Sequence, residues 1–212
     1  MSAWYISICK VIYFEFFSSI NDAEKGEIRS KLLQNFGSEP VYQIALQAAV
    51  SIGKIARFDV PKEWPELLPA LVQAVQVQDS LIQHRALLVL HHTIKSLASK
   101  RLAADRRIFH DMIEELLPFL MPIWQMYNSQ IVQIFTCGQS NMEESQVTNH
   151  IEKAVLVLKV IRKAIINGLK KPCENENAVV FIQSLIQQIK VVLPFSKSFK
   201  KIQLKLTAPH WD

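Results

Sequence analysis

The spacing of apolar residues most strongly limits what this chain can fold into. Across residues 147–168 the apolar side chains follow one another at alternating steps of four and three: Val147, Ile151, Ala154, Leu158, Ile161 and Ile165. Such steps place side chains on one stripe of an α-helix, whereas a strand requires alternation. The chain also has only five glycines, too few for the tight turns of an all-β sandwich. The sequence therefore predicts an all-α fold.

The same pattern predicts a series of helices separated by polar or proline-containing turns. Asn21 or Asp22 is suited to cap the first of them. Pro118 and Pro122 are expected to kink or divide the long fifth helix, because each proline removes a helical hydrogen bond. The expected helices cover residues 22–36, 40–57, 64–77, 80–99, 105–134, 147–168 and 176–193.

Taken in order, these helices pair into hairpins whose first members begin near residues 22, 64 and 105, at intervals of 42 and 41 residues. Two-helix repeats of about 40–47 residues are typical of HEAT and armadillo arrays. We therefore predict a HEAT- or armadillo-like helical-repeat solenoid of about three and a half hairpins over residues 21–193. Residues 194–212 are expected to form a disordered tail, and the last helix is expected to leave an apolar face uncovered.

Charge and hydropathy at the two ends exclude further classes. Residues 1–20 form an atypical apolar segment, but Lys10 and Glu15 interrupt it, so it does not predict a membrane span, which needs about 20 apolar residues. The net charge of +5 belongs mostly to residues 190–212, which hold five lysines and one aspartate. The remaining residues carry 19 basic and 18 acidic side chains, so the body has no net bias toward nucleic acid.

The sequence gives no support for a catalytic, metal or cofactor site. No two of its clustered histidines have the four-residue spacing of a helical zinc site: His84, His91, His92 and His110. A glycine-rich phosphate loop is absent, and Cys173 lies in a loop without a nucleophile signature. Cys9, Cys137 and Cys173 are odd in number and lack metal-like spacing, so we expect reduced thiols in the cytosol or nucleus. We predict a non-enzymatic protein without a cofactor.

Residues 58–69, "FDVPKEWPELLP", join two long helices by a stiff connection, because each proline fixes φ and lacks a backbone donor. We expect Pro61 and Pro65 at or near the start of a first helix, with Trp64 wedged between neighbouring hairpins. Burying the indole is worth about 2–3 kcal/mol. The residues of this structural motif are Asp59, Pro61, Trp64, Pro65, Leu67 and Pro69.

This motif, preceded by "SIGKIARFD" and followed by "DSLIQHRALL", resembles the amino-terminal region of importin-β-type karyopherins, and "LKVIRKAIINGL" resembles their importin-eleven branch. The resemblance covers residues 22–193. It implies a nuclear import receptor that binds Ran in its GTP form, carries protein cargo on a concave surface and crosses the nuclear pore by contacts with Phe-Gly nucleoporins. Such receptors shuttle between cytoplasm and nucleus. The family has further hairpins before residue 22 and many after residue 193, so the resemblance implies an amino-terminal fragment.

In that family the second helix of each hairpin lines the inner surface, so the resemblance places partner contacts on the polar faces of residues 40–57, 80–99 and 147–168. The side chains expected to contact partners are Gln43, His84, Arg85, Lys95 and Arg101. Two alternatives remain open: a generic helical-repeat scaffold for protein–protein interaction without transport activity, and a nucleic-acid-binding helical domain. The basic tail itself could bind an anionic membrane or nucleic acid.

Overall fold

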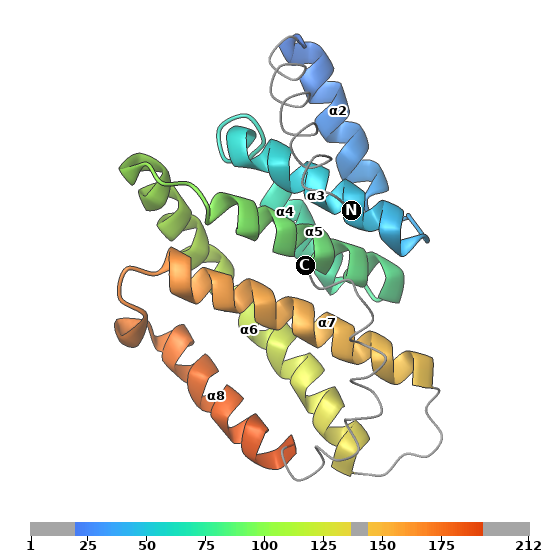
Figure 1. The fold of residues 1–212 in the computed structure, drawn as a ribbon, viewed down its shortest axis with the longest axis vertical. Coiled ribbons are helices and arrows are strands. Elements are labelled where there is room, and N and C mark those ends of the chain that lie inside the picture. Colours follow the sequence, from blue (N-terminus) through green and yellow to red (C-terminus); the bar gives the residue numbers. More distant parts are fainter. Residues whose placement is uncertain (1–19, 137–143, 193–212) are drawn as a thin grey trace, which may run out of the picture.

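The computed structural model describes residues 20–136 and 144–192, and this part of the chain consists of helices joined by turns, without a strand (Figure 1). Three hairpins and one further helix follow in order: α2 (Asp22–Asn35) with α3 (Tyr42–Asp59), α4 (Leu67–Gln76) with α5 (Ser80–Leu97), α6 (Ala103–Thr136) with α7 (Glu144–Lys163), and α8 (Glu176–Val192). A π-helical turn, Ala164–Gly168, extends α7. The prediction of an all-α repeat solenoid is confirmed.

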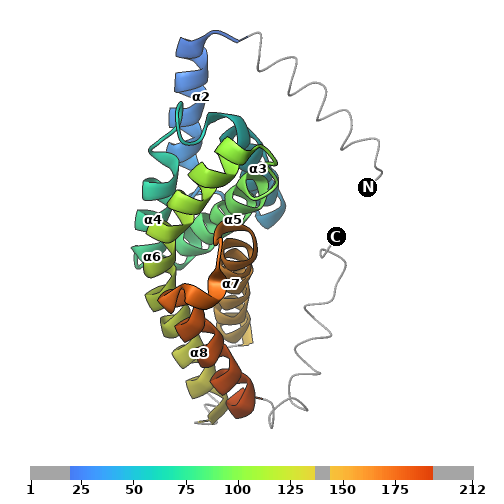
Figure 2. The ribbon, with the colours of Figure 1, turned by 90° about the vertical axis from the view of Figure 1, so that its left-hand side faces the viewer.

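The helices form two layers. The first helices of the hairpins lie along one side of the molecule and the second helices, α3, α5 and α7, along the other (Figure 2). One continuous hydrophobic cluster runs through all hairpins between the layers. Helix α2 is the least integrated element, since it holds no fully buried residue and only Leu32, Leu33 and Phe36 pack against the cluster. Each repeat therefore depends on its neighbours for burial.

Local capping explains where two helices begin. The Asn21 side chain accepts a hydrogen bond from the backbone of Glu24 at 2.8 Å, and the Glu24 carboxylate accepts one from the backbone of Asn21 at 3.3 Å. This reciprocal pair is a capping box, so Asn21 and not Asp22 is the cap of α2. Asp79 caps α5 by accepting from Leu81 at 2.8 Å and Ile82 at 3.0 Å. Both helices thus begin where their side chains satisfy free backbone donors.

Of the two outcomes expected for the fifth helix, a kink or a division, the division does not occur, because α6 continues through both Pro118 and Pro122. The two prolines lie four residues apart on the exposed face of the helix. Carbonyl groups freed by a proline on that face can be hydrated. The opposite face is buried along its length, at Ile113, Leu117 and Trp124 among others, and its packing holds the helix continuous.

The proline junction is built around Trp64, which is only 2% exposed. Helix α4 begins at Leu67, three residues later than expected, because the backbone N–H of Trp64 donates to the Asp59 carbonyl at 3.1 Å and closes a turn after the end of α3. Pro65 therefore precedes the helix, and Pro69 occupies its first turn, where a backbone donor is not needed. Trp64 belongs to the cluster between the layers, as predicted for a joint between hairpins.

An ion pair that the sequence did not predict fixes this junction to the preceding hairpin. Arg29 of α2 donates to the Asp59 carboxylate at 2.8 Å and to the Glu63 carbonyl at 2.6 Å. The two charged side chains are 12% and 10% exposed. The carboxylate of Asp59 therefore pairs with a cation of the first hairpin. The backbone carbonyl of Asp59 accepts a hydrogen bond from the junction that leads into the second hairpin.

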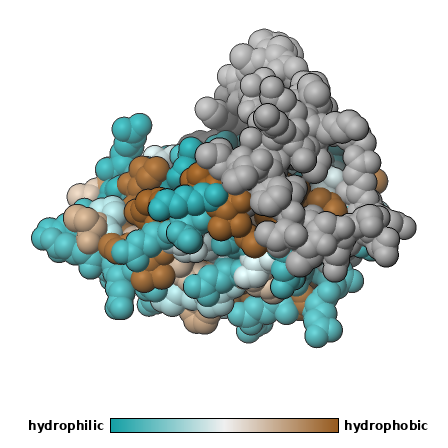
Figure 3. Space-filling model, turned by 90° about the horizontal axis from the view of Figure 1, so that it is seen from below, coloured by the Kyte–Doolittle hydropathy of each residue, from teal (hydrophilic) through white to brown (hydrophobic). Residues whose placement is uncertain are grey.

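Helix α8 exposes a row of large apolar residues, as expected for a helix without a covering neighbour. Val180, Ile182, Ile186 and Ile189 are each 43–52% exposed. Seen from below, brown apolar surface lies among teal hydrophilic surface (Figure 3). No helix within residues 20–136 and 144–192 is long and apolar enough to cross a membrane.

The predictions for residues 1–19, Cys9, Cys137 and residues 194–212 lie outside the described residues.

Candidate partner-binding surface

The second helices α3, α5 and α7 pack side by side and run parallel, so equivalent turns of successive repeats are neighbours. Arg57, at the end of α3, donates to the carbonyl of Ser96 at the end of α5 at 3.1 Å. Near the other end of α5, His84 Nε2 lies 3.6 Å from a carboxylate oxygen of Glu152 in α7. These contacts fix the register of the three helices that form the candidate surface.

Two of the predicted contact residues lie inside this layer. His84 and Arg85 are only 7% and 5% exposed. Arg85 donates to the carbonyls of Glu39 and Pro40 at 2.8 and 2.9 Å, and its guanidinium lies 5.7 Å from the centre of the Tyr42 ring. The side chain therefore anchors the turn before α3 to α5, and we assign it an internal role in place of the expected surface role.

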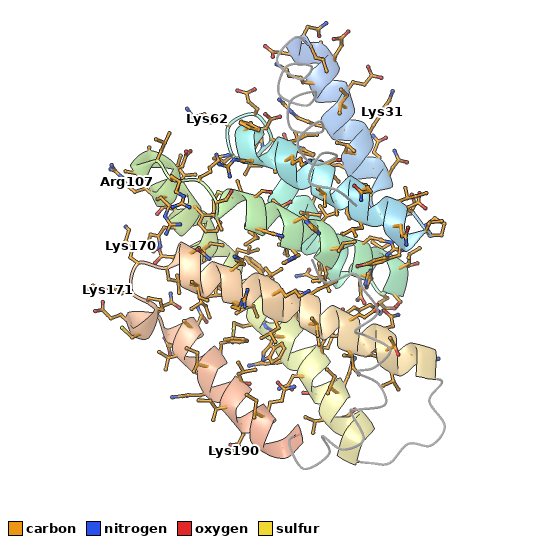
Figure 4. The ribbon with its side chains drawn as sticks, viewed as in Figure 1. Lys31, Lys62, Arg107, Lys170, Lys171 and Lys190 are labelled. Carbon is orange, nitrogen blue, oxygen red and sulfur yellow. The ribbon has the colours of Figure 1, made fainter. Side chains whose placement is uncertain are left out.

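The other three predicted residues are exposed but lie apart. Gln43 lies in the first turn of α3 and Lys95 in the last turn of α5. In parallel helices at 1.5 Å per residue this separates them by roughly 20 Å. Arg101 lies in the connection between α5 and α6, at the edge where the loops between hairpins gather, marked by Lys62, Arg107, Lys170 and Lys171 in Figure 4. The structure does not bring these side chains into one site.

A polar network that the sequence analysis missed links α7 to the start of α5. Lys153 is 3% exposed, and its ammonium donates to Ser80 Oγ at 2.8 Å and to Gln83 Oε1 at 3.1 Å. Tyr127 of α6 donates to the same oxygen of Gln83 at 3.3 Å. Burial lowers the pKa of Lys153. The partners lie about 70 residues away in sequence, so no local signal could have identified them.

Towards the carboxyl end of α5, His91 and His92 lie between α3 and α7, with ring centres 5.2 Å apart. Burial, with smaller effects of His92 and nearby lysines, lowers the pKa of His91 to about 3. Burial, with smaller effects of Lys95 and Lys159, lowers the pKa of His92 to about 4. Both rings are therefore neutral near pH 7. In the part of the chain that the structure describes, no group of three His, Cys, Asp or Glu residues could hold a metal ion.

Comparison with known proteins identifies relatives of this chain. The chain is 41% identical to Importin-11 of Mus musculus and 40% identical to Importin-11 of Homo sapiens, in each case over 180 residues or 85% of its length. It is 32% identical over 163 residues, 74% of its length, to the importin beta-like protein kap113 of Schizosaccharomyces pombe. Over these residues the chain is an importin-11-like member of the importin-β family.

The importin-11-like chain spans 18% of the length of either mammalian relative and 16% of the fission-yeast protein. It matches no protein-family model and no solved structure. The resemblance inferred from the proline junction and from the helices around it is thus confirmed at the level of family and branch.

Proposed function

We propose that this importin-11-like chain acts in nuclear import as part of a transport receptor, and that it binds Ran in the GTP form together with protein cargo. The observations that carry the proposal are the similarity to importins over 85% of the chain and the layer of parallel second helices, whose ends expose polar side chains such as Gln43 and Lys95. Such a receptor works by surface complementarity, without catalysis or a cofactor.

The exposed ends of the second helices are the proposed contact surface. Gln43 is placed at the amino end of this face and Lys95 at its carboxyl end, so one partner must span roughly 20 Å to touch both. Arg101 at the neighbouring edge extends the surface for a second partner. Weak contacts with Phe-Gly nucleoporins are proposed for exposed apolar residues of the first helices, such as Phe119 and Met126 of α6.

A pull-down with purified Ran tests this proposal. The full chain is immobilised and offered Ran loaded with a non-hydrolysable GTP analogue or with GDP. Retention of the GTP form at several times the level of the GDP form is the expected result. Equal retention of both forms, or none, contradicts the proposal and favours a scaffold without transport activity.

A further inference from the structure

Two successive connections between hairpins expose apolar side chains next to cations at one edge of the molecule. Leu102, just before α6, is 71% exposed, and Ile166, in the turn that ends α7, is 66% exposed. They are the two most exposed large apolar side chains among the described residues. We call them, together with the neighbouring cations, the loop-edge patch. Its members are Leu102, Arg106, Arg107, Ile166 and Lys170, with Arg101 beside them.

Two contacts hold these connections together. His110 Nδ1 of α6 donates to the Gly168 carbonyl at 2.9 Å. A β-carbon added at Gly168 would lie 2.6 Å from a side chain of α6, so the end of α7 is in close contact with the first part of α6. Arg106 and Arg107 lie one turn before His110 on the same side of α6, and Lys170 lies two residues after Gly168. Arg107 and Lys170 accordingly project from the same edge (Figure 4).

The cations of the loop-edge patch have no ion-pair partners within the fold. Residues 98–107 and 164–175 hold six basic and two acidic side chains. Each acidic side chain is already paired, Asp105 with Lys100 at 3.4 Å and Glu174 with Lys171 at 2.8 Å. Among the described residues, no carboxylate lies within ion-pair distance of the other four cations, Arg101, Arg106, Arg107 and Lys170. These four charges are available to an external anionic group.

The stability of the fold does not explain these residues. Arg106 lies close to the start of α6, where the positive end of the helix dipole disfavours cations. Leu102 and Ile166 bury little apolar surface, so neither contributes much to the core. Single exposed apolar residues are common on protein surfaces. Two of them next to four unpaired cations, on connections that contact each other, indicate a surface that binds a partner.

We propose that the loop-edge patch binds an acidic amphipathic segment of a partner protein, one that carries Asp and Glu together with large apolar side chains. The carboxylates of the segment form charge-assisted hydrogen bonds with the Arg and Lys side chains, and its apolar side chains cover Leu102 and Ile166. The proposed function already assigns Arg101 to a second partner. The inference rests on the proposed function to that extent, and it names the chemistry of this partner.

The dimensions of the patch fit a short segment. Leu102 precedes His110 by eight residues, which is roughly 12 Å along the axis of α6, and Ile166 precedes Gly168 by two residues. A segment of ten residues spans roughly 15 Å as a helix and roughly 33 Å when extended, so it can reach both apolar side chains.

A protein segment is favoured over the other anionic partners. Nucleic acid binds single-stranded sites by stacking its bases on aromatic rings, whereas Leu102 and Ile166 are aliphatic. An anionic membrane is disfavoured because two aliphatic side chains bury little apolar area in a bilayer.

Fluorescence anisotropy with the full chain at low salt tests the inference, and the probe is the fluorescein-labelled peptide EELLEELLEE. The variant Leu102→Asp/Ile166→Asp should weaken binding at least about fivefold, because two apolar contacts are replaced by charges that repel the peptide. The matched control, Ile182→Asp/Ile186→Asp, makes the same change in net charge at exposed residues of α8. It should weaken binding less than about twofold.

A second pair of variants tests the cations. Arg107→Gln/Lys170→Gln should weaken binding at least about threefold, because two charge-assisted hydrogen bonds are lost. The control Lys31→Gln/Lys190→Gln removes two exposed charges elsewhere (Figure 4) and should change binding less than about 1.5-fold. Circular dichroism of each variant is measured first. If Leu102→Asp/Ile166→Asp loses its helical signal, Leu102→Ser/Ile166→Ser replaces it and should weaken binding at least about threefold.

Several results would overturn the inference. Absence of peptide binding would do so directly, and equal weakening by Leu102→Asp/Ile166→Asp and by its control in α8 would mean that net charge accounts for binding. Decaglutamate bound as tightly as EELLEELLEE would mean that the apolar side chains take no part. A decathymidylate oligonucleotide bound more tightly than the peptide, with the same loss in Arg107→Gln/Lys170→Gln, would identify a nucleic-acid surface. The pull-down with the two forms of Ran tests the proposed function separately, so the two failures are distinguishable.

Discussion

Gly53 lies where α3 comes closest to α5. A β-carbon at this position would lie 2.8 Å from the backbone carbonyl oxygen of His92, which cannot move aside without moving its helix. We therefore expect Gly53→Ala to lower the free energy of unfolding by about 1–3 kcal/mol. Gly26 of α2 is the matched control, since nothing lies within 4 Å of its added β-carbon. Gly26→Ala should raise the free energy of unfolding by about 0.5–1 kcal/mol.

Urea denaturation followed by circular dichroism measures both variants. If Gly53→Ala lowers the free energy of unfolding and Gly26→Ala raises it, the close approach of α3 and α5 is supported. If Gly53→Ala leaves the free energy of unfolding unchanged or raises it, the two backbones are further apart.

The buried histidines of α5 predict a pH dependence of stability. Their pKa values fall from 6.5 to about 3 for His91 and about 4 for His92 on folding, so the unfolded chain binds more protons below about pH 6.5. The free energy of unfolding should therefore fall as the pH drops, by roughly 2 kcal/mol between about pH 7 and pH 5 after allowance for partial exposure. His91→Gln/His92→Gln should remove most of this slope, and an unchanged slope in that variant would disprove the assignment.

At the residue scale, the sequence identified surface residues better than it identified buried polar ones. Gln43, Lys95 and Arg101 are exposed as a polar helical face predicts. His84 and Arg85 also lie outside the apolar stripe, yet the neighbouring second helices cover them. Their partners come from other repeats, such as the carbonyl of Glu39 for Arg85, and helical periodicity within one helix carries no information about such partners.

At the element scale, the ion pair between Arg29 and Asp59 connects helix α2 to the junction that leads from the first hairpin into the second. Both side chains are mostly buried, so removing one leaves an unpaired charge. Arg29→Met and Asp59→Asn are each expected to lower the free energy of unfolding by about 2–3 kcal/mol, discounted for residual exposure. The double variant should lose clearly less than the sum of the two single losses.

The exposed pair Glu27–Lys31 is the control, with side chains 65% and 68% exposed. Lys31→Met should change stability by less than about 0.5 kcal/mol. Thermal or urea unfolding of the two single variants, the double variant and Lys31→Met measures these changes. If the loss of unfolding free energy in the double variant equals the sum of the losses at Arg29 and Asp59, the pair does not couple the two repeats.

The helices themselves could be predicted because their stripes and caps are local. The bounds of α3, α5 and α8 agree with the expected ranges to within two residues, and Asn167-Gly168 ends the helical run as expected. Two details differ from the simplest expectation, an undivided α6 and a later start of α4, for reasons that are not local. The packing of its buried face keeps α6 continuous through Pro118 and Pro122, and the Asp59 carbonyl delays the start of α4.

At the scale of the whole molecule, pairing of consecutive helices was enough to predict a solenoid. The first helices begin at residues 22, 67, 103 and 176. The first two intervals depart from the expected 42 and 41 residues because α4 begins later and α6 begins earlier than expected. The third interval is longer because it contains α6, the longest of the described helices. The stacking of second helices follows from this pairing. The hydrogen bonds that fix the register of these helices, such as the one from Lys153 to Ser80, could not be predicted.

The central claim is that partners bind on the layer formed by the second helices. Hydrogen–deuterium exchange of the full chain, with and without Ran in its GTP-bound form, tests it most directly. The account predicts slower exchange in peptides from α3 and α5, no change in α4 and α6, and no effect of Ran in its GDP-bound form. Slower exchange confined to α4 and α6, or no change anywhere on adding the GTP form, would contradict it.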